Sequence, residues 1–204
     1  PGNPGRSLTI IWLQIQNYLL YWLWQFGKSG MVVVQAVVFA GFLGLGVRGS
    51  LTQRRNDRGA WWLLLLLWLV TGAGLVAYMN FKPGFSLGYA KDLFPDINNH
   101  EVRERDYFFV VSFVVWGLWA GMGLWSLVKR AAERRAGTTA KIPVAAALFL
   151  VALVPPVLNW REASRSSGAD RTLAADLAYN LLNTVPPYGI LFTYGDNDTF
   201  PLWW

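Results

Sequence analysis

The sequence predicts an all-α integral membrane bundle of about five transmembrane helices, followed by the start of an extracytoplasmic α/β unit. The first observation is composition: 54% of the 204 residues are hydrophobic and 15% are charged, against about 25% charged in soluble domains. The second is that long uncharged apolar segments alternate with short charged clusters. The third is that these segments give way after residue 160 to polar sequence with short amphipathic elements.

Four segments contain no formal charge and are long enough for a helix to cross about 30 Å of hydrocarbon, which takes about 20 residues. These segments are residues 30–47, 60–80, 107–128 and 142–160. Residues 1–160 are therefore predicted to form the multi-span region. Residues 161–204 are predicted to form the start of a soluble region. The chain has no initiator Met and stops in mid-pattern, so we expect it to be a fragment in which this region is truncated.

The fifth segment, residues 8–26, is mixed in character. Gln14, Asn17, Tyr21 and Gln25 recur at spacings of three and four, so a helix would carry them on one face. Such a helix could span the membrane with this face turned to its neighbours, or lie in the interface as an amphipathic helix. We expect a span, because the segment is long enough and uncharged.

The connecting loops predict the orientation. Residues 48–59 and 129–141 are rich in arginine and lysine, which places them in the cytoplasm. Residues 81–106 and the region after 160 carry a balanced or acidic mixture, so both are expected on the other side of the membrane. Four segment ends carry Trp, the residue that prefers the membrane interface: Trp61, Trp62, Trp125 and Trp160.

Composition also excludes several kinds of site. The chain has no cysteine, so neither a disulfide nor a thiolate metal site can form. The single histidine, His100, excludes a zinc site that needs two imidazoles. The net charge of +6 lies in clusters between apolar segments, a membrane pattern, and no nucleic-acid partner is predicted.

The region after residue 160 predicts a helix and then a strand. The helix would begin with Asp170 as its N-cap and end at Pro186–Pro187. Residues 188–194, YGILFTY, have the composition of a short buried strand. Helix, strand and a following helix opened by Thr199 and Pro201 would begin an α/β unit.

An acidic cluster, Asp196–Asn197–Asp198, follows that predicted strand. Carboxylates spaced like Asp196 and Asp198 can hold a divalent cation, and a strand followed by D-x-D weakly indicates an aspartyl-phosphate phosphatase. The alternative is a turn, in which Asp196 and Asn197 bond their own backbone and Asp198 or Thr199 caps the next helix. We expect the turn more than the cation site.

A second charged cluster, HEVRERD at residues 100–106, directly precedes an apolar segment. Arg103 and Arg105 could grip a phosphate, and Glu104 or Asp106 could act as a general base or orient an arginine. The alternative is a self-neutralising collar of salt bridges that anchors the start of the helix. Within the apolar segments, Gly117 and Gly121 form a GxxxG packing motif, and Pro155–Pro156 is expected to kink or end its helix.

Four stretches resemble the bacterial membrane-protein family catalogued as domain of unknown function 2723 (DUF2723). They are YMNFKPGFS (78–86), HEVRERDYFF (100–109), DLAYNLL (176–182) and GILFTYGDNDTFPLWW (189–204). This family is related to eukaryotic transmembrane protein O-mannosyltransferases and is placed among glycosyltransferases of the C-type fold. The resemblance implies an internal fragment of a protein in the bacterial inner (cytoplasmic) membrane, with the C-terminal region extracytoplasmic.

The resemblance further implies transfer of a sugar from a polyprenyl-phosphate donor to an acceptor, such as a protein Ser or Thr hydroxyl or a glycan. Enzymes of that fold typically keep their catalytic acid in a first extracytoplasmic loop, which this sequence lacks. The candidate catalytic residues here are Glu104 and Asp106. The candidate substrate-binding residues are His100, Arg103, Arg105, Asp196, Asn197 and Asp198. A divalent cation is the candidate cofactor, and membrane lipids are expected partners. The alternative function is a non-catalytic membrane scaffold or transporter-like anchor that displays a soluble domain.

Overall fold

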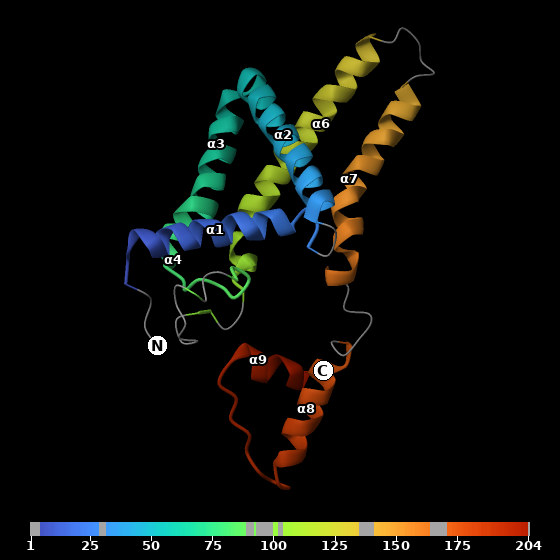
Figure 1. Cartoon of the computed structure of the whole chain (residues 1–204). Helices are drawn as coiled ribbons and strands as arrows, with labels where there is room; N and C mark the ends of the chain where they lie inside the picture. The colour runs from blue at the N-terminus through green and yellow to red at the C-terminus, as the bar shows by residue number, and fades with distance from the viewer. Residues whose placement is uncertain are drawn as a thin grey trace. The chain divides into compact units, whose positions relative to one another are not determined.

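The computed structural model describes residues 5–28, 32–88, 92, 100–101, 104–134, 141–163 and 171–203. The chain divides into two compact units, Pro1–Asn159 and Trp160–Trp204, and each is described by itself (Figure 1). The first unit contains the long apolar helices and the second contains short ones.

The described residues form helices and contain no strand. In chain order the helices are α1 (Leu8–Trp24), α2 (Val32–Asn56), α3 (Arg58–Leu69), α4 (Leu75–Met79), α6 (Val110–Arg134), α7 (Lys141–Ala163), α8 (Leu173–Thr184) and α9 (Asp196–Thr199). A π-helical turn, Val70–Gly74, joins α3 to α4. Two 3-10 turns, Asp106–Phe109 and Phe200–Trp203, open α6 and follow α9.

Three helices among the described residues are long and apolar enough to cross a membrane: Val32–Asn56, Arg58–Met79 and Asp106–Ala131. The prediction of a helical membrane protein is confirmed to this extent. The segment at 142–160 falls within α7, and its span stays a prediction. This helix continues through Pro155 and Pro156 to Ala163, so the two prolines do not end it, and the alternative of a kink stays a prediction. Membrane helices accept proline because neighbouring groups can satisfy the freed carbonyls.

The arginine-rich hairpin between α2 and α3 is turned by a single aspartate. The Asp57 carboxylate accepts a hydrogen bond from the Ala60 N–H at 3.0 Å and so caps the start of α3. Arg54 and Arg55 lie in the last turn of α2, where their positive charge complements the helix dipole. The predicted cytoplasmic cluster therefore also stabilises the tight turn between two membrane helices.

α1 runs crosswise to α2, α3 and α6 (Figure 1), and it contacts α4, the helix α2 and the 3-10 turn that opens α6. It is capped by Ser7, whose hydroxyl accepts from the Ile10 N–H at 3.2 Å. At its other end the Asn159 amide donates to the Trp24 and Gln25 carbonyls at 2.9 and 3.0 Å, which satisfies backbone groups that the helix itself leaves unpaired. The helix Leu8–Trp24 is not among the described helices that are long and apolar enough to cross a membrane, and both a span at 8–26 and an amphipathic helix in the interface stay predictions.

The polarity of α1 explains why it lies across the bundle. Its buried face carries polar side chains, with Gln14 at 2% and Asn17 at 0% exposure. Its outer face is aliphatic and aromatic, including Leu8, Trp12 and Leu19. The buried amides need hydrogen-bond partners, and they find them in the loop after α4 rather than in the apolar flank of a neighbouring span.

Three glycines outside the predicted GxxxG motif let α2 and α6 pack closely. A Cβ at Gly49 would overlap the Trp119 backbone carbonyl, and one at Gly123 would overlap that of Leu45. At Gly46 a Cβ would meet the Trp116 ring. The GxxxG pair itself has no such close contact, because a Cβ at Gly117 or Gly121 meets no described atom within 4 Å, which agrees with a chance occurrence of the motif in a glycine-rich membrane helix. Spacing alone could not tell which glycines face a partner.

The second unit contains the predicted helix, α8, but not the predicted strand. Residues 189–194 have no regular structure, and Tyr188 has a left-handed φ of 65°. A strand needs a neighbour to pair with its backbone groups, and no strand is present among the described residues. The α/β expectation is thus not met there. The N-cap position of α8 is Thr172, while Asp170 lies outside the described residues.

Candidate functional site

The candidate site is built on the loop that follows α4. α4 ends at Asn80, whose φ of 43° turns the chain away from the helix. Gln14 of α1 donates from its amide to the Phe81 carbonyl at 2.6 Å and to the Asn80 side chain at 3.2 Å. The Asn17 side-chain carbonyl accepts from the Gly84 N–H at 3.0 Å. The polar face of α1 therefore fixes the backbone of this loop from two points.

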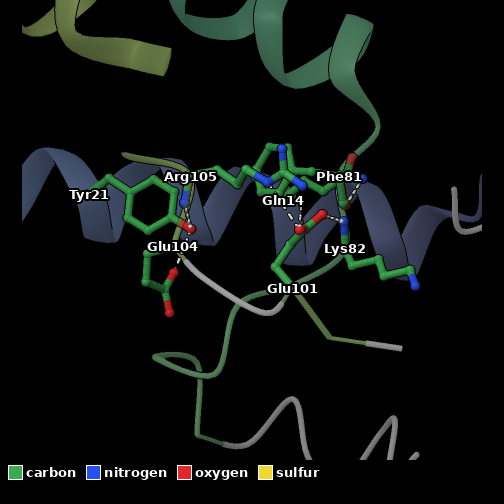
Figure 2. Close-up of polar contacts among 7 residues, drawn as sticks. All are labelled: Gln14, Tyr21, Phe81, Lys82, Glu101, Glu104 and Arg105. Carbon is green, nitrogen blue, oxygen red and sulfur yellow. Dashed lines mark hydrogen bonds and ion pairs between the residues drawn. The ribbon is translucent and has the colours of Figure 1, made fainter. Parts of the chain in front are cut away.

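Glu104 is held at the centre of the site by groups from α1 and the loop. Tyr21 donates its hydroxyl to Oε2 of Glu104 at 2.6 Å (Figure 2). Ser86 donates to Oε1 from its hydroxyl at 2.6 Å and from its backbone N–H at 3.1 Å. A carboxylate has about four acceptor positions. Three donors therefore fix its orientation, and one acceptor position, on Oε2, is not used by them.

Tyr21 is itself held in place by its neighbours. It has 0% exposure, and its oxygen accepts from the Arg105 backbone N–H at 3.3 Å and from the Asn17 amide at 3.4 Å. Burial, followed by the hydrogen bond to Glu104, raises the pKa of Tyr21 above its ordinary value. The phenol therefore stays protonated and remains a donor to Glu104.

Arg105 pairs with Glu101 rather than with Glu104. Its Nε and Nη2 donate to one Glu101 oxygen at 3.0 and 2.8 Å (Figure 2). The other Glu101 oxygen accepts from the Lys82 N–H at 3.1 Å. The hydrogen bond to Glu101 raises the pKa of Arg105. This pair matches the predicted salt-bridge collar, and it ties Glu101 and Arg105 to the loop.

The remaining members of the charged cluster have different surroundings. His100 is 4% exposed, stacks on Phe85 with ring centroids 4.8 Å apart, and has Nδ1 3.3 Å from the Pro83 carbonyl. Asp106 is the first residue of the 3-10 turn that opens α6, where its charge complements the helix dipole. Arg103 lies outside the described residues. Their proposed roles in substrate binding and catalysis stay predictions.

The acidic cluster in the second unit forms a helical turn. Residues 196–199 are α9, with Gly195 at the N-cap position and no side-chain cap hydrogen bond. The expected cap by Asp198 or Thr199 is therefore wrong, and Thr199 instead hydrogen-bonds Thr193 at 2.8 Å. Among the described residues no group of three or more His, Asp or Glu could hold a metal ion. A cation at Asp196 and Asp198, and substrate binding by this cluster including Asn197, stay predictions.

Sequence reasoning missed the residues that hold Glu104. Tyr21 was recognised as part of a polar face, but its partner lies 83 positions away. Gly84 and Ser86 belong to the stretch YMNFKPGFS (78–86), but the sequence alone assigns neither residue a role. Asn17 and Tyr21 did indicate that α1 has polar partners elsewhere in the chain, because polar side chains on an apolar helix need hydrogen-bond partners when they are buried.

Gly84 leaves the space that the Glu104 carboxylate occupies, which gives a test of the site's geometry. A Cβ at Gly84 would overlap the Glu104 carboxylate. Gly84→Ala should therefore displace Glu104 and destabilise the protein by about 1–3 kcal/mol. Thermal unfolding of the solubilised protein measures this effect. Gly88→Ala is the control, because a Cβ there meets no described atom within 4 Å; equal effects of the two substitutions would contradict the geometry.

The fold and this site describe a helical membrane protein with an anchored carboxylate at one end of its helices. A model of the family described as TMEM260-associated domain 2 matches residues 174–204. No curated protein and no solved structure matches the chain. The match supports the part of the predicted resemblance that concerns relatives of O-mannosyltransferases, while DUF2723 itself stays a prediction.

Proposed function

We propose that the chain is part of a membrane-embedded glycosyltransferase that transfers a sugar from a polyprenyl-phosphate donor to an acceptor hydroxyl on the extracytoplasmic side. The observation that carries this proposal is Glu104, a carboxylate oriented by Tyr21 and Ser86 that keeps one acceptor position for a further hydroxyl. The family match adds support, because TMEM260 has been proposed to be a protein O-mannosyltransferase.

In this reaction Glu104 accepts the proton of the acceptor hydroxyl. The acceptor oxygen forms a bond to the anomeric carbon of the sugar, and the bond from that carbon to the phosphate oxygen breaks. Polyprenyl phosphate leaves with the electron pair, so negative charge grows on its phosphate. A cationic group near that phosphate lowers the barrier. Arg103 is the proposed cation, because Arg105 is engaged by Glu101.

The location is also part of the proposal. Glu104 lies between α4 and α6, at the ends opposite the arginine-rich hairpin of α2 and α3. Charge counts predict that the hairpin is cytoplasmic, so the site would face the extracytoplasmic side. The lipid of the donor would then lie in the membrane, with its phosphate at the level of residues 103–106.

The test is a transfer assay on the full-length protein in lipid bilayers, with polyprenyl-phosphate sugars and Ser/Thr-containing acceptor peptides. Arg103→Ala should raise the donor KM about 10–100-fold, the range expected when hydrogen bonds to a charged group are lost. Arg105→Ala should have a smaller effect on KM and a larger one on thermal stability. Arg55→Ala, in the cytoplasmic hairpin, is the control.

Two outcomes would count against this function. Absence of turnover with every donor would favour the non-catalytic scaffold. Turnover with an unchanged donor KM in both Arg103→Ala and Arg105→Ala would reject the role of these arginines in binding phosphate.

A further inference from the structure

An apolar groove of about 420 Å³ lies between α1 and the end of the neighbouring membrane helix. One wall is formed by the aliphatic side chains of Ile11, Ile15 and Leu19 on α1. The other wall is formed by Ala73, Val76 and Ala77, from the π-helical turn and α4. The groove does not include Glu104, Tyr21 or Ser86, but it shares Gln14 and Asn80 with the loop of the candidate site.

The shape of this groove follows from the helix that forms its second wall. The π-helical turn Val70–Gly74 widens the helix locally, and such turns occur often at functional sites. Ala73 and Ala77 are small and lie exposed on the wall, opposite the long side chains of α1. Because Ala73 and Ala77 are small, the packing leaves the groove open. Two larger residues at these positions would fill it.

A membrane crossed by the helix Arg58–Met79 would place this groove near the level where hydrocarbon meets lipid headgroups, because its second wall lies at the end of that helix. The second wall of the groove belongs to the last turns of the helix Arg58–Met79. Only 11% of the apolar stretch of this helix is buried inside the protein. The outer surface beside it is apolar as well, with Val70 63% exposed. An exposed apolar surface on a membrane-length helix favours lipid as its neighbour, so the expected occupant is a lipid chain rather than a soluble molecule.

Arg6 supplies a positive charge at the mouth of the groove. Its Nη2 donates to the Ala77 carbonyl at 3.0 Å, which fixes the guanidinium beside the end of α4. A guanidinium has five N–H donors, so others remain for a ligand at this exposed position. The lining residues include no acidic side chain. Arginine beside the membrane surface is suited to a lipid phosphate.

We propose that this groove binds one acyl chain of an anionic phospholipid, with Arg6 holding its phosphate. The inference goes beyond sugar transfer, because it concerns a resident membrane lipid rather than a donor. A volume of 420 Å³ is at the small end for ligand pockets, which fits a single chain better than a whole polyprenyl donor. Gln14 and Tyr18 also line the groove, so the bound lipid would support the docking of α1.

The test is native mass spectrometry of the full-length protein, titrated in detergent with phosphatidylglycerol, phosphatidylcholine or polyprenyl phosphate. Phosphatidylglycerol should be retained in preference to phosphatidylcholine. Arg6→Ala should weaken its binding about tenfold or more, because a charge-assisted hydrogen bond is lost. Ala73→Leu should abolish binding by filling the groove.

The controls are Arg55→Ala and Ala40→Leu, which change an arginine and an exposed alanine elsewhere in the first unit. Both should bind phosphatidylglycerol as the unmodified protein does. Equal retention of the two phospholipids, unchanged binding in Arg6→Ala and Ala73→Leu, or preferential retention of polyprenyl phosphate would each overturn the proposal. Lipid retention does not depend on turnover, so a failed transfer assay leaves this test valid.

Discussion

Glu104→Gln should lower kcat for sugar transfer by a factor of about 10²–10⁴, the usual contribution of a general base. The substitution keeps the shape of the side chain and removes its ability to take a proton. The glutamine carbonyl can still accept from Ser86, and the Tyr21 hydroxyl can turn to accept from the amide. The site should therefore remain folded while the chemical step becomes slow.

The separation of kcat from KM is the informative part of this measurement. Donor KM should change little, since Glu104 is proposed to contact the acceptor hydroxyl and not the donor phosphate. Glu133→Gln, an exposed glutamate near the end of α6, is the matched control and should leave kcat unchanged. A Glu104→Gln protein with normal kcat and a lowered unfolding temperature would show that Glu104 only holds the loop.

Gly49→Ala should destabilise the protein by about 1–3 kcal/mol, the typical cost of overpacking. The new methyl group would overlap the Trp119 backbone carbonyl, which cannot move without shifting α6. Gly123→Ala should act in the same way through the Leu45 carbonyl. Unfolding of the solubilised protein, followed by tryptophan fluorescence, would measure both effects because Trp116 and Trp119 lie at this interface.

For the control substitutions, the expected change in stability has the opposite sign. Alanine in place of an open helical glycine normally stabilises by about 0.5–1 kcal/mol. Gly121→Ala and Gly44→Ala should behave in this way, since a Cβ at either meets no described atom within 4 Å. If all four substitutions stabilised the protein equally, the close approach of α2 and α6 would be refuted.

The membrane helices could be predicted from the sequence because hydrocarbon thickness fixes the length of a spanning apolar segment. Residues 60–80 and 107–128 correspond closely to the helices Arg58–Met79 and Asp106–Ala131. The crosswise course of α1 could not be predicted with the same certainty, since length and lack of charge allow both a span and a surface helix. The outcome depends on where Gln14 and Asn17 find partners, which is a tertiary property.

The candidate site was partly predictable for a related reason. A dense charged cluster beside an apolar segment marks residues that must pair or bind a ligand, and this pointed to Glu104 and Arg105. It could not show that Arg105 pairs with Glu101 while Glu104 accepts from Tyr21. It also misjudged residues 188–194, because strand composition has no structural effect without a partner strand.

The contacts that assemble the Glu104 cluster join residues far apart in the chain, and this sets the order in which the protein can mature. Gln14 meets Phe81 across 67 positions, and Tyr21 meets Glu104 across 83. During synthesis, the side-chain amides of Gln14 and Asn17 on α1 therefore have no partner in this loop until two further membrane helices have been inserted. Only when residue 104 has left the ribosome can the cluster close, so it should be among the last parts of the first unit to become resistant to proteolysis.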